Sequence, residues 1–305
     1  MPIVLSENFR ALFYAPFYAA QATGAFDRAG VEVVLKSSPS PEAAARALRS
    51  GEADVMWGGP LRVMITHDRE PGADLICFCD VVARDPFFVI GAQPRPDFRL
   101  ADLALVSFAS VSEVPTPWIC LADDLRRAGV DPTRLRRVDD RTMAENELAL
   151  RSGKLDAIQV FQPHAERLIA SGAGHVWYAA ATRGLTAYTT LVSRRGTLAR
   201  RSEELLAMTV AMHRTLQWFG KAPAADIAGR LRSYFPDVES GIFASAIDRY
   251  RALDLWATDP VIHREGYERL HAAMRAAGAL SRDIAFDLCV DTALARRARA
   301  ESAGQ

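Results

Sequence analysis

Apolar runs of strand length alternate with helical segments over the first two thirds of the chain. Short continuous apolar runs predict buried strands, and apolar residues that recur every three or four positions predict helices. The predicted strands cover residues 2–5, 31–35, 54–57, 75–82, 87–92, 103–108 and 155–160. The predicted helices cover residues 17–29, 41–49, 60–67, 117–128, 142–151 and 163–170. Strands and helices that alternate in this way predict an α/β fold with mainly parallel sheets flanked by helices.

One segment of the sequence occurs twice. Ala47-Leu-Arg-Ser-Gly-Glu-Ala-Asp54 recurs about a hundred residues later as Ala149-Leu-Arg-Ser-Gly-Lys-Leu-Asp156, and each copy leads into a predicted strand. A single, widely spaced pair indicates one supersecondary unit used in two similar lobes, not a solenoid. Two similar lobes imply a cleft between them.

Prolines mark the candidate boundary between these lobes. Two of them interrupt regular structure in residues 93–97, which we take as the crossover into the second lobe. The predicted division assigns residues 1–93 to the first part of lobe 1, 94–188 to lobe 2, and 189–305 to the return to lobe 1 and the C-terminal helices.

The last third of the chain changes character. Helical periodicity without intervening strands is present in residues 203–219, 224–234, 240–252 and 260–277. Amphipathic helices must bury their apolar faces, so we expect this helical tail to pack on lobe 1. The last fifteen or so residues resemble a solvated end of the chain.

Composition narrows the possible partners. Lysine plus arginine and aspartate plus glutamate both total 37 in the 305 residues, so no net charge favours nucleic acid. No apolar run approaches the roughly 20 residues that a membrane span needs, and no signal peptide is recognisable. We therefore expect a monomer that does not span a membrane, cytoplasmic as the sequence stands, or periplasmic if a leader peptide has been removed. The four cysteines do not form a disulfide framework or a metal site.

Four segments should approach one another at the cleft, because ligands bind beyond the carboxyl ends of parallel strands. These segments are residues 8–18, 57–60, 107–118 and 161–164. Their aromatic side chains could line a pocket for a planar or apolar ligand. The candidate ligand-binding residues are Arg10, Tyr14, Phe17, Trp57, Gly58, Gly59, Ser107, Ser110, Ser112, Thr116, Trp118, Phe161, Gln162 and Tyr188.

Each of these residues also has a purely structural interpretation. Gly58 and Gly59 would let a backbone approach a ligand closely, or they form a tight turn. The hydroxyls before residue 117 could hold a carboxylate, sulfonate or phosphate together with helix amides, or they cap the helix. Arg10 and Arg62 are possible anion partners, or they are solvated surface groups. The acidic groups Asp80, Asp85 and Glu113 could instead receive an amine or a ring nitrogen.

The sequence contains no catalytic signature that we recognise. It lacks the Gly-x-Ser-x-Gly elbow, the Gly-x-Gly-x-x-Gly fingerprint, the phosphate loop ending in Gly-Lys-Ser/Thr and the His-Glu-x-x-His zinc motif. His164 alone among the histidines falls in a predicted cleft segment, and an exposed helix start explains it more simply than catalysis. Binding of a ligand without chemistry, and without a cofactor, is the simpler interpretation.

The first part of the chain resembles a known family. Tyr14-Ala-Pro-Phe-Tyr-Ala-Ala20, Gly24-Ala-Phe26, Ala29-Gly-Val-Glu-Val33 and the first repeat copy are similar to solute-binding proteins of ABC importers for sulfonates, nitrate and thiamine precursors. This family includes the thiamine-pyrimidine synthases of fungi. The resemblance covers residues 3–195, with its most specific motifs in the first ninety or so.

The resemblance implies a two-lobed periplasmic-binding-protein-like fold of type II, with ligand bound between lobes that close by hinge motion. It further implies an ABC permease as a partner and a small organic solute, aromatic, heterocyclic or anionic, as ligand. The positions that it implies for the site are Tyr14, Phe17, Trp57, Gly58, Gly59 and residues 107–116.

Departures from the enzymatic relatives argue against catalysis. The synthase branch has a cofactor-binding lysine and a sacrificial histidine where this chain has Gly58-Gly-Pro-Leu-Arg62. A related desulfinase has a cysteine in the loop that corresponds to residues 7–14, and here that loop has none. The alternative that stays open is an enzyme of the same fold acting on a small heterocycle or aromatic acid.

Overall fold

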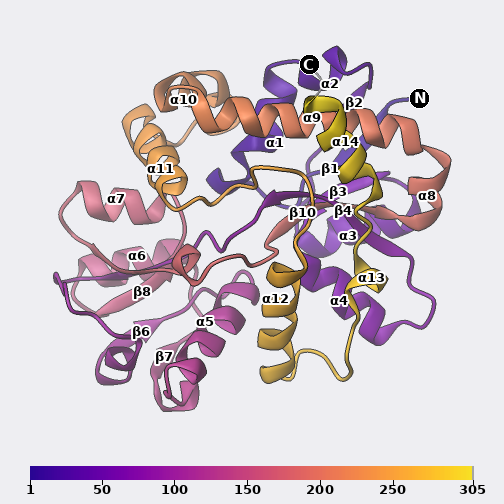
Figure 1. Cartoon of the computed structure of the whole chain (residues 1–305). Helices are drawn as coiled ribbons and strands as arrows, with labels where there is room; N and C mark the ends of the chain where they lie inside the picture. The colour runs from indigo at the N-terminus through magenta and orange to yellow at the C-terminus, as the bar shows by residue number, and fades with distance from the viewer. Residues whose placement is uncertain (304–305) are drawn as a thin grey trace.

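The computed structural model describes residues 1–303 and shows two lobes, each built on a five-stranded sheet flanked by helices (Figure 1). The first sheet has the order β2 (Val33–Lys36), β1 (Ile3–Ser6), β3 (Val55–Gly58), β10 (Thr189–Arg194), β4 (Leu75–Val82). The second has the order β7 (Arg136–Val138), β6 (Ser107–Ala109), β8 (Ala157–Val160), β5 (Phe88–Gly91), β9 (His175–Ala179). The predicted α/β fold with two lobes is confirmed.

The two sheets have matching topologies. Each sheet contains three adjacent parallel strands, and the middle one comes first in the chain. In the first sheet β1 lies between β2 and β3, and in the second β6 lies between β7 and β8. The strand that enters from the other lobe, β10 or β5, runs antiparallel to both of its neighbours. Each sheet is therefore mainly parallel, as predicted, with four strands in one direction and a single strand, β10 or β5, in the opposite direction.

The helices of the two lobes lie between their strands in the chain. Lobe 1 contains α1 (Ala15–Ala22), α2 (Ala25–Arg28), α3 (Pro41–Ser50) and α4 (Pro60–Arg69). Lobe 2 contains α5 (Thr116–Arg127), α6 (Met143–Arg151) and α7 (His164–Ala170). Short 3₁₀ turns are η1 (Leu12–Tyr14), η2 (Leu100–Leu105), η3 (Pro132–Arg134) and η4 (Ala180–Arg183). The rest of the chain forms α8 (Arg195–Arg200), α9 (Ser202–Lys221), α10 (Ala224–Leu231), α11 (Ser240–Ala252), α12 (Arg264–Ala276), α13 (Phe286–Cys289) and α14 (Ala293–Ala303).

The chain crosses to lobe 2 earlier than the prolines suggested. Strand β5 pairs with β8 and β9, so the crossover lies between Val82 and Phe88, and the boundary at residue 93 is corrected accordingly. The apolar run Phe88–Gly91 is fully buried inside the second sheet, whereas the prolines of residues 93–97 occupy a loop within lobe 2. The return crossover ends where β10 begins at Thr189.

A third segment joins the two crossovers. Thr186 donates its N–H to Ala83 O at 2.8 Å, and Ala83 in turn donates to Leu255 O at 3.0 Å. Ala257 donates to Val81 O at 3.0 Å. The hinge region therefore consists of three hydrogen-bonded segments, one of them from the C-terminal tail.

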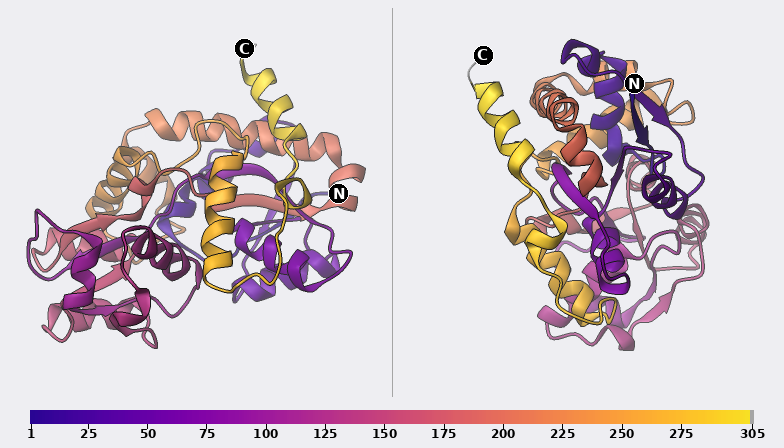
Figure 2. Two further views of the ribbon diagram at one scale, coloured as in Figure 1. Left: turned by 60° about the horizontal axis from the view of Figure 1, so that its bottom comes forward. Right: turned by 90° about the vertical axis from the view of Figure 1, so that its right-hand side faces the viewer.

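The C-terminal tail covers both lobes, not lobe 1 alone as predicted. Helix α9 packs on α1 and α2, but α11 packs on α7 and α12 packs on both α4 and α5 (Figures 1 and 2). An apolar cluster around α12 combines Met64 of lobe 1, Ile119 of lobe 2 and Leu270 of the tail. The predicted solvated end is also corrected, because α14 packs along α9 and buries Leu294 and Ala298.

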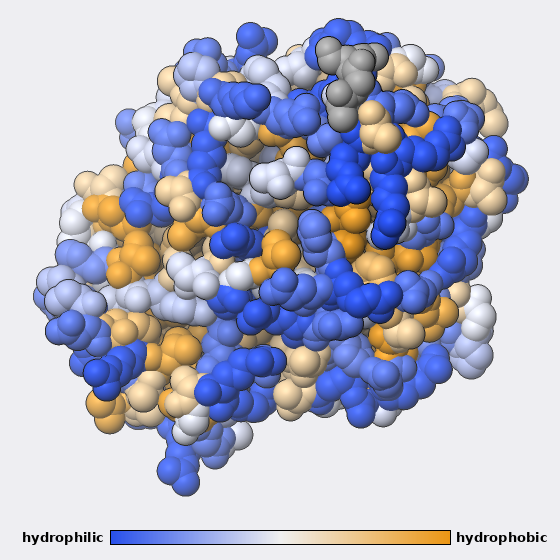
Figure 3. Space-filling view, in the orientation of Figure 1, coloured by the Kyte–Doolittle hydropathy of each residue, from blue (hydrophilic) through white to orange (hydrophobic). Residues whose placement is uncertain are grey.

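The face of the molecule seen in Figure 3 offers no broad hydrophobic surface. Hydrophobic residues occur there in small groups separated by hydrophilic ones. Within the described residues, no helix combines the length and the apolar character needed to cross a membrane.

The repeated segment serves the same structural purpose in both lobes. Gly51 and Gly153 follow the repeat helices with positive φ values of 86° and 69°, a conformation that glycine adopts without strain. Asp54 Oδ2 then accepts a hydrogen bond from the N–H of Val4 at 3.0 Å, and Asp156 Oδ2 accepts one from the N–H of Ser107 at 2.8 Å. Each copy thus fixes the amino end of the middle strand of its parallel trio, β1 or β6.

Removing either aspartate should destabilise the protein by a similar amount. Asp54→Ala and Asp156→Ala each leave a strand N–H without its partner, so the free energy of unfolding should fall by about 1–2 kcal/mol. Urea denaturation measures the change, with Asp74→Ala at an exposed position as the control. If the control loses as much stability as either variant, the proposed purpose of the repeat is wrong.

Candidate functional site

A cleft between the lobes has two adjoining parts. The inner pocket, about 60 Å³ in volume, is bounded by residues of β3–α4, of the α5 start and of both crossovers. The outer chamber is about 540 Å³ in volume. Phe9, Pro41 and Val114 line both parts, so the two form one continuous cleft.

Polar groups concentrate at the inner pocket. Asn8 Nδ2 donates a hydrogen bond to Tyr14 Oη at 3.1 Å. Burial raises the pKa of Tyr14 to about 12 and that of Tyr188 well above its usual value, so both hydroxyls stay neutral. Arg62, partly exposed, donates to Glu42 Oε1 at 2.9 Å. The pocket therefore combines one guanidinium with neutral hydrogen-bonding groups.

Two helix N-termini meet at the same pocket. Gly59, Leu61 and Arg62 at the start of α4 face Pro115 and Thr116 at the start of α5 across the cleft. Helix N-termini carry partial positive charge and amides without intrahelical partners. The sequence forms these two helix starts locally, since a proline occupies the first turn of each. This arrangement suits an anion or a carbonyl oxygen.

The outer chamber is mainly apolar and aromatic. Phe9, Leu12, Met143 and Phe161 line it, and the Phe161 ring packs edge-on against Phe13 with centroids 5.2 Å apart. The chamber therefore suits the hydrophobic part of a ligand.

Three charged side chains at the outer chamber are held by ion pairs or hydrogen bonds. Arg10 pairs with Glu7 at 3.3 Å, and His164 Nδ1 lies 2.8 Å from Glu147 Oε2. Glu113 Oε1 accepts the N–H of Met143 at 2.8 Å. These groups position the walls of the chamber.

The structure brings six of the candidate residues together at the cleft. They come from the loop after β1, the β3–α4 and β6–α5 connections, the end of β8 and the return crossover. These residues are Arg10, Tyr14, Gly59, Thr116, Phe161 and Tyr188.

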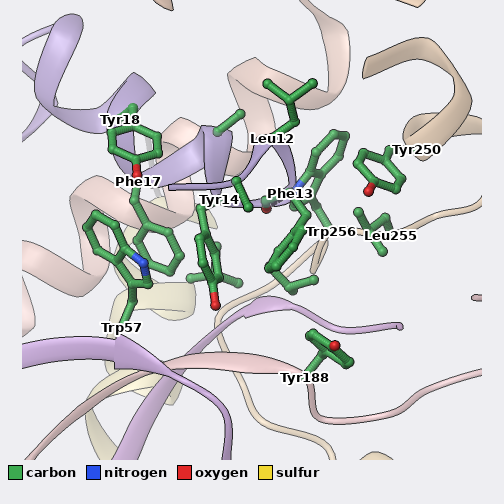
Figure 4. Close-up of a cluster of buried hydrophobic side chains, with 14 of the residues drawn as sticks. Leu12, Phe13, Tyr14, Phe17, Tyr18, Trp57, Tyr188, Tyr250, Leu255 and Trp256 are labelled. Carbon is green, nitrogen blue, oxygen red and sulfur yellow. Dashed lines mark hydrogen bonds between the residues drawn. The ribbon is translucent and has the colours of Figure 1, made fainter. Parts of the chain in front are cut away.

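Phe17, Trp57 and Gly58 lie in the core of lobe 1 instead. The Phe17 and Trp57 rings stack with centroids 4.7 Å apart, and the side chains are 1% and 0% exposed (Figure 4). Trp57 follows the strand pleat toward α1, away from the cleft, and Gly58 is buried inside β3. Their predicted place in the pocket wall is corrected.

The remaining candidates also lie outside the cleft lining. Ser107 is at the amino end of β6, where its hydroxyl donates to Asp156 at 2.7 Å. Ser110 is buried and accepts a hydrogen bond from Arg137, whose guanidinium also covers the Trp118 ring at 4.1 Å. Ser112 is exposed.

Gln162 and two of the alternative acids are likewise buried away from the cleft. Gln162 is fully buried and hydrogen-bonded to Glu166. Burial raises the pKa of Asp80 to about 8, and this carboxyl lies inside β4. Asp85 belongs to an ion-pair cluster described below. Of the three acids, only Glu113 lines the outer chamber.

Residues of the C-terminal tail complete the outer chamber and were missed from the sequence. Tyr234, Phe235, Pro236, Asp237 and Val238, between α10 and α11, form one of its walls. An aromatic pair directly before a proline, in a break between two helices, is the signal that could have indicated them.

A buried ion-pair cluster fixes both crossovers relative to the cleft. Arg183, at the end of η4, pairs with Asp85 of the first crossover at 2.5 Å and also with Asp124 of α5. Burial opposes the charge on Arg183, but the two carboxylates outweigh it and hold the pKa of the guanidinium well above its usual value. Tyr178 Oη donates to Asp124 at 2.9 Å, and the N–H of Phe87 donates to Asp85 at 2.9 Å. Asp85 and Asp124 each have the guanidinium and a further hydrogen-bond donor as partners.

Two similar mixed α/β lobes, joined by crossovers around a cleft, define a type II periplasmic-binding-protein-like fold of solute-binding proteins. The NMT1-like family matches residues 9–231, and the chain belongs to this family.

Several named proteins are similar to this chain. "Putative binding protein YtlA" of Bacillus subtilis (strain 168) is 22% identical over 304 residues, which cover 98% of this chain and 90% of YtlA. The periplasmic aliphatic sulphonate binding protein SsuA of Escherichia coli has a TM-score of 0.76 at 14% identity, covering 93% of this chain and 96% of that one. The alkanesulfonate-binding protein SsuA of Xanthomonas axonopodis pv. citri, bound to MOPS, has a TM-score of 0.73 at 14% identity, covering 96% and 98%. The solved structures establish the fold.

Arg183→Met should lower the free energy of unfolding by about 3–5 kcal/mol near neutral pH, because two buried carboxylates lose their partner. The loss should be smaller in mild acid, since burial already raises the pKa of Asp85 and a protonated carboxyl needs no cation. Urea denaturation at both pH values measures the effect.

The neighbouring Arg84 provides a control, because it is 29% exposed and lies 3.8 Å from the exposed Asp254. Arg84→Met should cost less than about 1 kcal/mol. Equal stability of the Arg183 and Arg84 variants would show that the buried cluster does not hold the hinge.

Proposed function

We propose that this protein binds a small aromatic or heterocyclic solute with an anionic group in the cleft between its lobes. One observation carries the proposal. The inner pocket, with its two opposed helix N-termini and Arg62, opens into the aromatic outer chamber. The anionic group lies in the inner pocket, and the ring lies in the outer chamber.

Electrostatics supports the inner pocket as the place of the anion. The N-termini of α4 and α5 approach it from opposite lobes, and each contributes partial positive charge. Arg62 adds a full charge, and among the described residues one partly exposed ion pair, with Glu42, offsets it. An anion that contacts both helix starts stabilises the closed arrangement of the lobes, because it binds that arrangement better than an open one.

Size and polarity support the outer chamber as the place of the ring. Its volume of about 540 Å³ exceeds that of a single aromatic ring and lies in the range of small-molecule sites. Aromatic neighbours such as Phe9 and Phe161 offer edge and face contacts to a flat ligand.

The partner that fits this function is an ABC permease, which receives the solute from the binding protein. The names of two similar structures describe sulfonate binding proteins, and one of them holds MOPS, which joins a ring to a sulfonate. By analogy, we propose that the present chain is the solute-binding component of an importer, or a close relative of such a component.

A thermal-shift screen tests the proposed ligand class. Benzoate, benzenesulfonate, pyrimidines and nitrate are compared, and at least one aryl anion should raise the melting temperature by roughly 5 °C at a concentration near 100 Kd. Arg62→Met should abolish that shift because the anion loses its guanidinium partner. Arg49→Met, which removes an exposed arginine of α3 outside the cleft, should leave it intact.

Two results would contradict the proposal. One is the absence of a shift with every compound, and the other is a shift that Arg62→Met and Arg49→Met reduce equally.

A further inference from the structure

The segment between α10 and α11, residues 232–239, is called the tail loop below. We infer that the tail loop is a ligand-contacting wall and that Val238 sets the size of the aromatic group that the cleft accepts. The inference rests on the proposed function and adds to it a determinant of specificity outside the two lobes.

The tail loop closes the outer chamber on one side. Five of its residues, Tyr234 to Val238, line the chamber together with Met143 and Phe161 of lobe 2 and Phe9 of lobe 1. A group that fills the chamber therefore touches the tail as well as both lobes. Without the tail loop, this side of the cleft would be open to solvent.

Contacts with lobe 1 hold the first half of the loop. Arg10 Nη1 donates to Tyr234 O at 3.2 Å. The Tyr18 ring packs against Tyr234 and Phe235, with centroid distances of 4.9 Å and 5.3 Å. Phe235 is 6% exposed and also packs on Phe243 of α11 at 5.3 Å. This half is anchored in the core.

Contacts with lobe 2 hold the second half. Arg167 of α7 donates through Nη2 to Asp237 O at 2.9 Å. On the next element, Arg249 of α11 pairs with Glu166 of α7 at 2.7 Å. The loop is thus fastened to both lobes, so in this arrangement its side chains lie at a set distance from the opposite wall of the chamber.

Val238 is the residue best placed to set this distance. It lines the chamber and is half-buried against the hydrophobic core, and its side chain makes no polar contact that a substitution would break. Phe235 is an anchor, and Tyr234 and Asp237 supply the backbone carbonyls that hold the loop. A larger residue at 238 shortens the chamber while these anchors remain.

Calorimetric titration with benzenesulfonate and 2-naphthalenesulfonate tests the inference on the full chain. Val238→Trp should weaken binding of the two-ring probe at least about tenfold, because the added indole occupies its space. Binding of the one-ring probe should change less than about threefold. Val238→Ala, which keeps the chamber open, should weaken both aryl probes by only about threefold through lost apolar contact.

Ser233→Trp is the matched control, since Ser233 is an exposed residue of the same loop outside the chamber lining. It should leave both affinities within about twofold of the wild type. The melting temperature of each variant is measured alongside, and Val238→Ala carries the test if the tryptophan variant is unfolded.

Three outcomes overturn the inference. The first is that Val238→Trp and Ser233→Trp change the affinity for the two-ring probe equally. If the tryptophan variant is unfolded, the corresponding outcome is that Val238→Ala changes the affinity for neither probe. The second is an equal loss of both probes in a folded Val238→Trp variant. The third is wild-type protein that binds benzenesulfonate but rejects 2-naphthalenesulfonate. Wild-type protein that binds neither probe contradicts the proposed ligand class itself, and the role of Val238 fails with it.

Discussion

The arrangement of the two lobes depends on one buried cation. Arg183, which comes immediately before the return crossover, is 4% exposed. It lies between Asp85 of the first crossover and Asp124 of α5. A buried charge is tolerated only where partners replace its lost hydration, and here two carboxylates do so while their own remaining positions are hydrogen-bonded. The cluster ties α5 of lobe 2 to both crossovers. Because Thr116 at the start of α5 lines the inner pocket, the cluster also determines where that helix N-terminus meets its counterpart on α4.

The cleft follows from the matching topologies of the two sheets. Each sheet receives one strand from the other lobe, so both crossovers pass the carboxyl ends of the parallel strands. The repeated Leu-Arg-Ser-Gly motif fixes the opposite, amino ends through Asp54 and Asp156. The residues that stabilise the sheets therefore lie at the amino ends of the strands, and the cleft lies at their carboxyl ends. The tail loop then adds a wall of the outer chamber that contacts both lobes.

Local signals predicted most of the elements but not the direction of single side chains. The predicted helices 41–49 and 117–128 end close to where α3 and α5 end, and Gly51 and Gly129, which follow these helices, both adopt positive φ. Trp57 was predicted for the cleft because it ends a strand, yet the pleat turns it into the core against Phe17. Only the register of β3 against β10 decides this, and register is a non-local property. The tail loop was missed for the same reason, since Tyr234 and Arg10 are brought together by tertiary packing alone.

In the proposed function, segments far apart in the sequence form one ligand site. Hydrogen–deuterium exchange with and without 2-naphthalenesulfonate tests it most directly, because backbone protection is resolved along the whole chain. Exchange should slow together in residues 8–14, 59–62, 114–118, 161–164 and 234–238. Protection confined to another surface, such as the groove lined by Phe88, Val176 and Ser245, would contradict it.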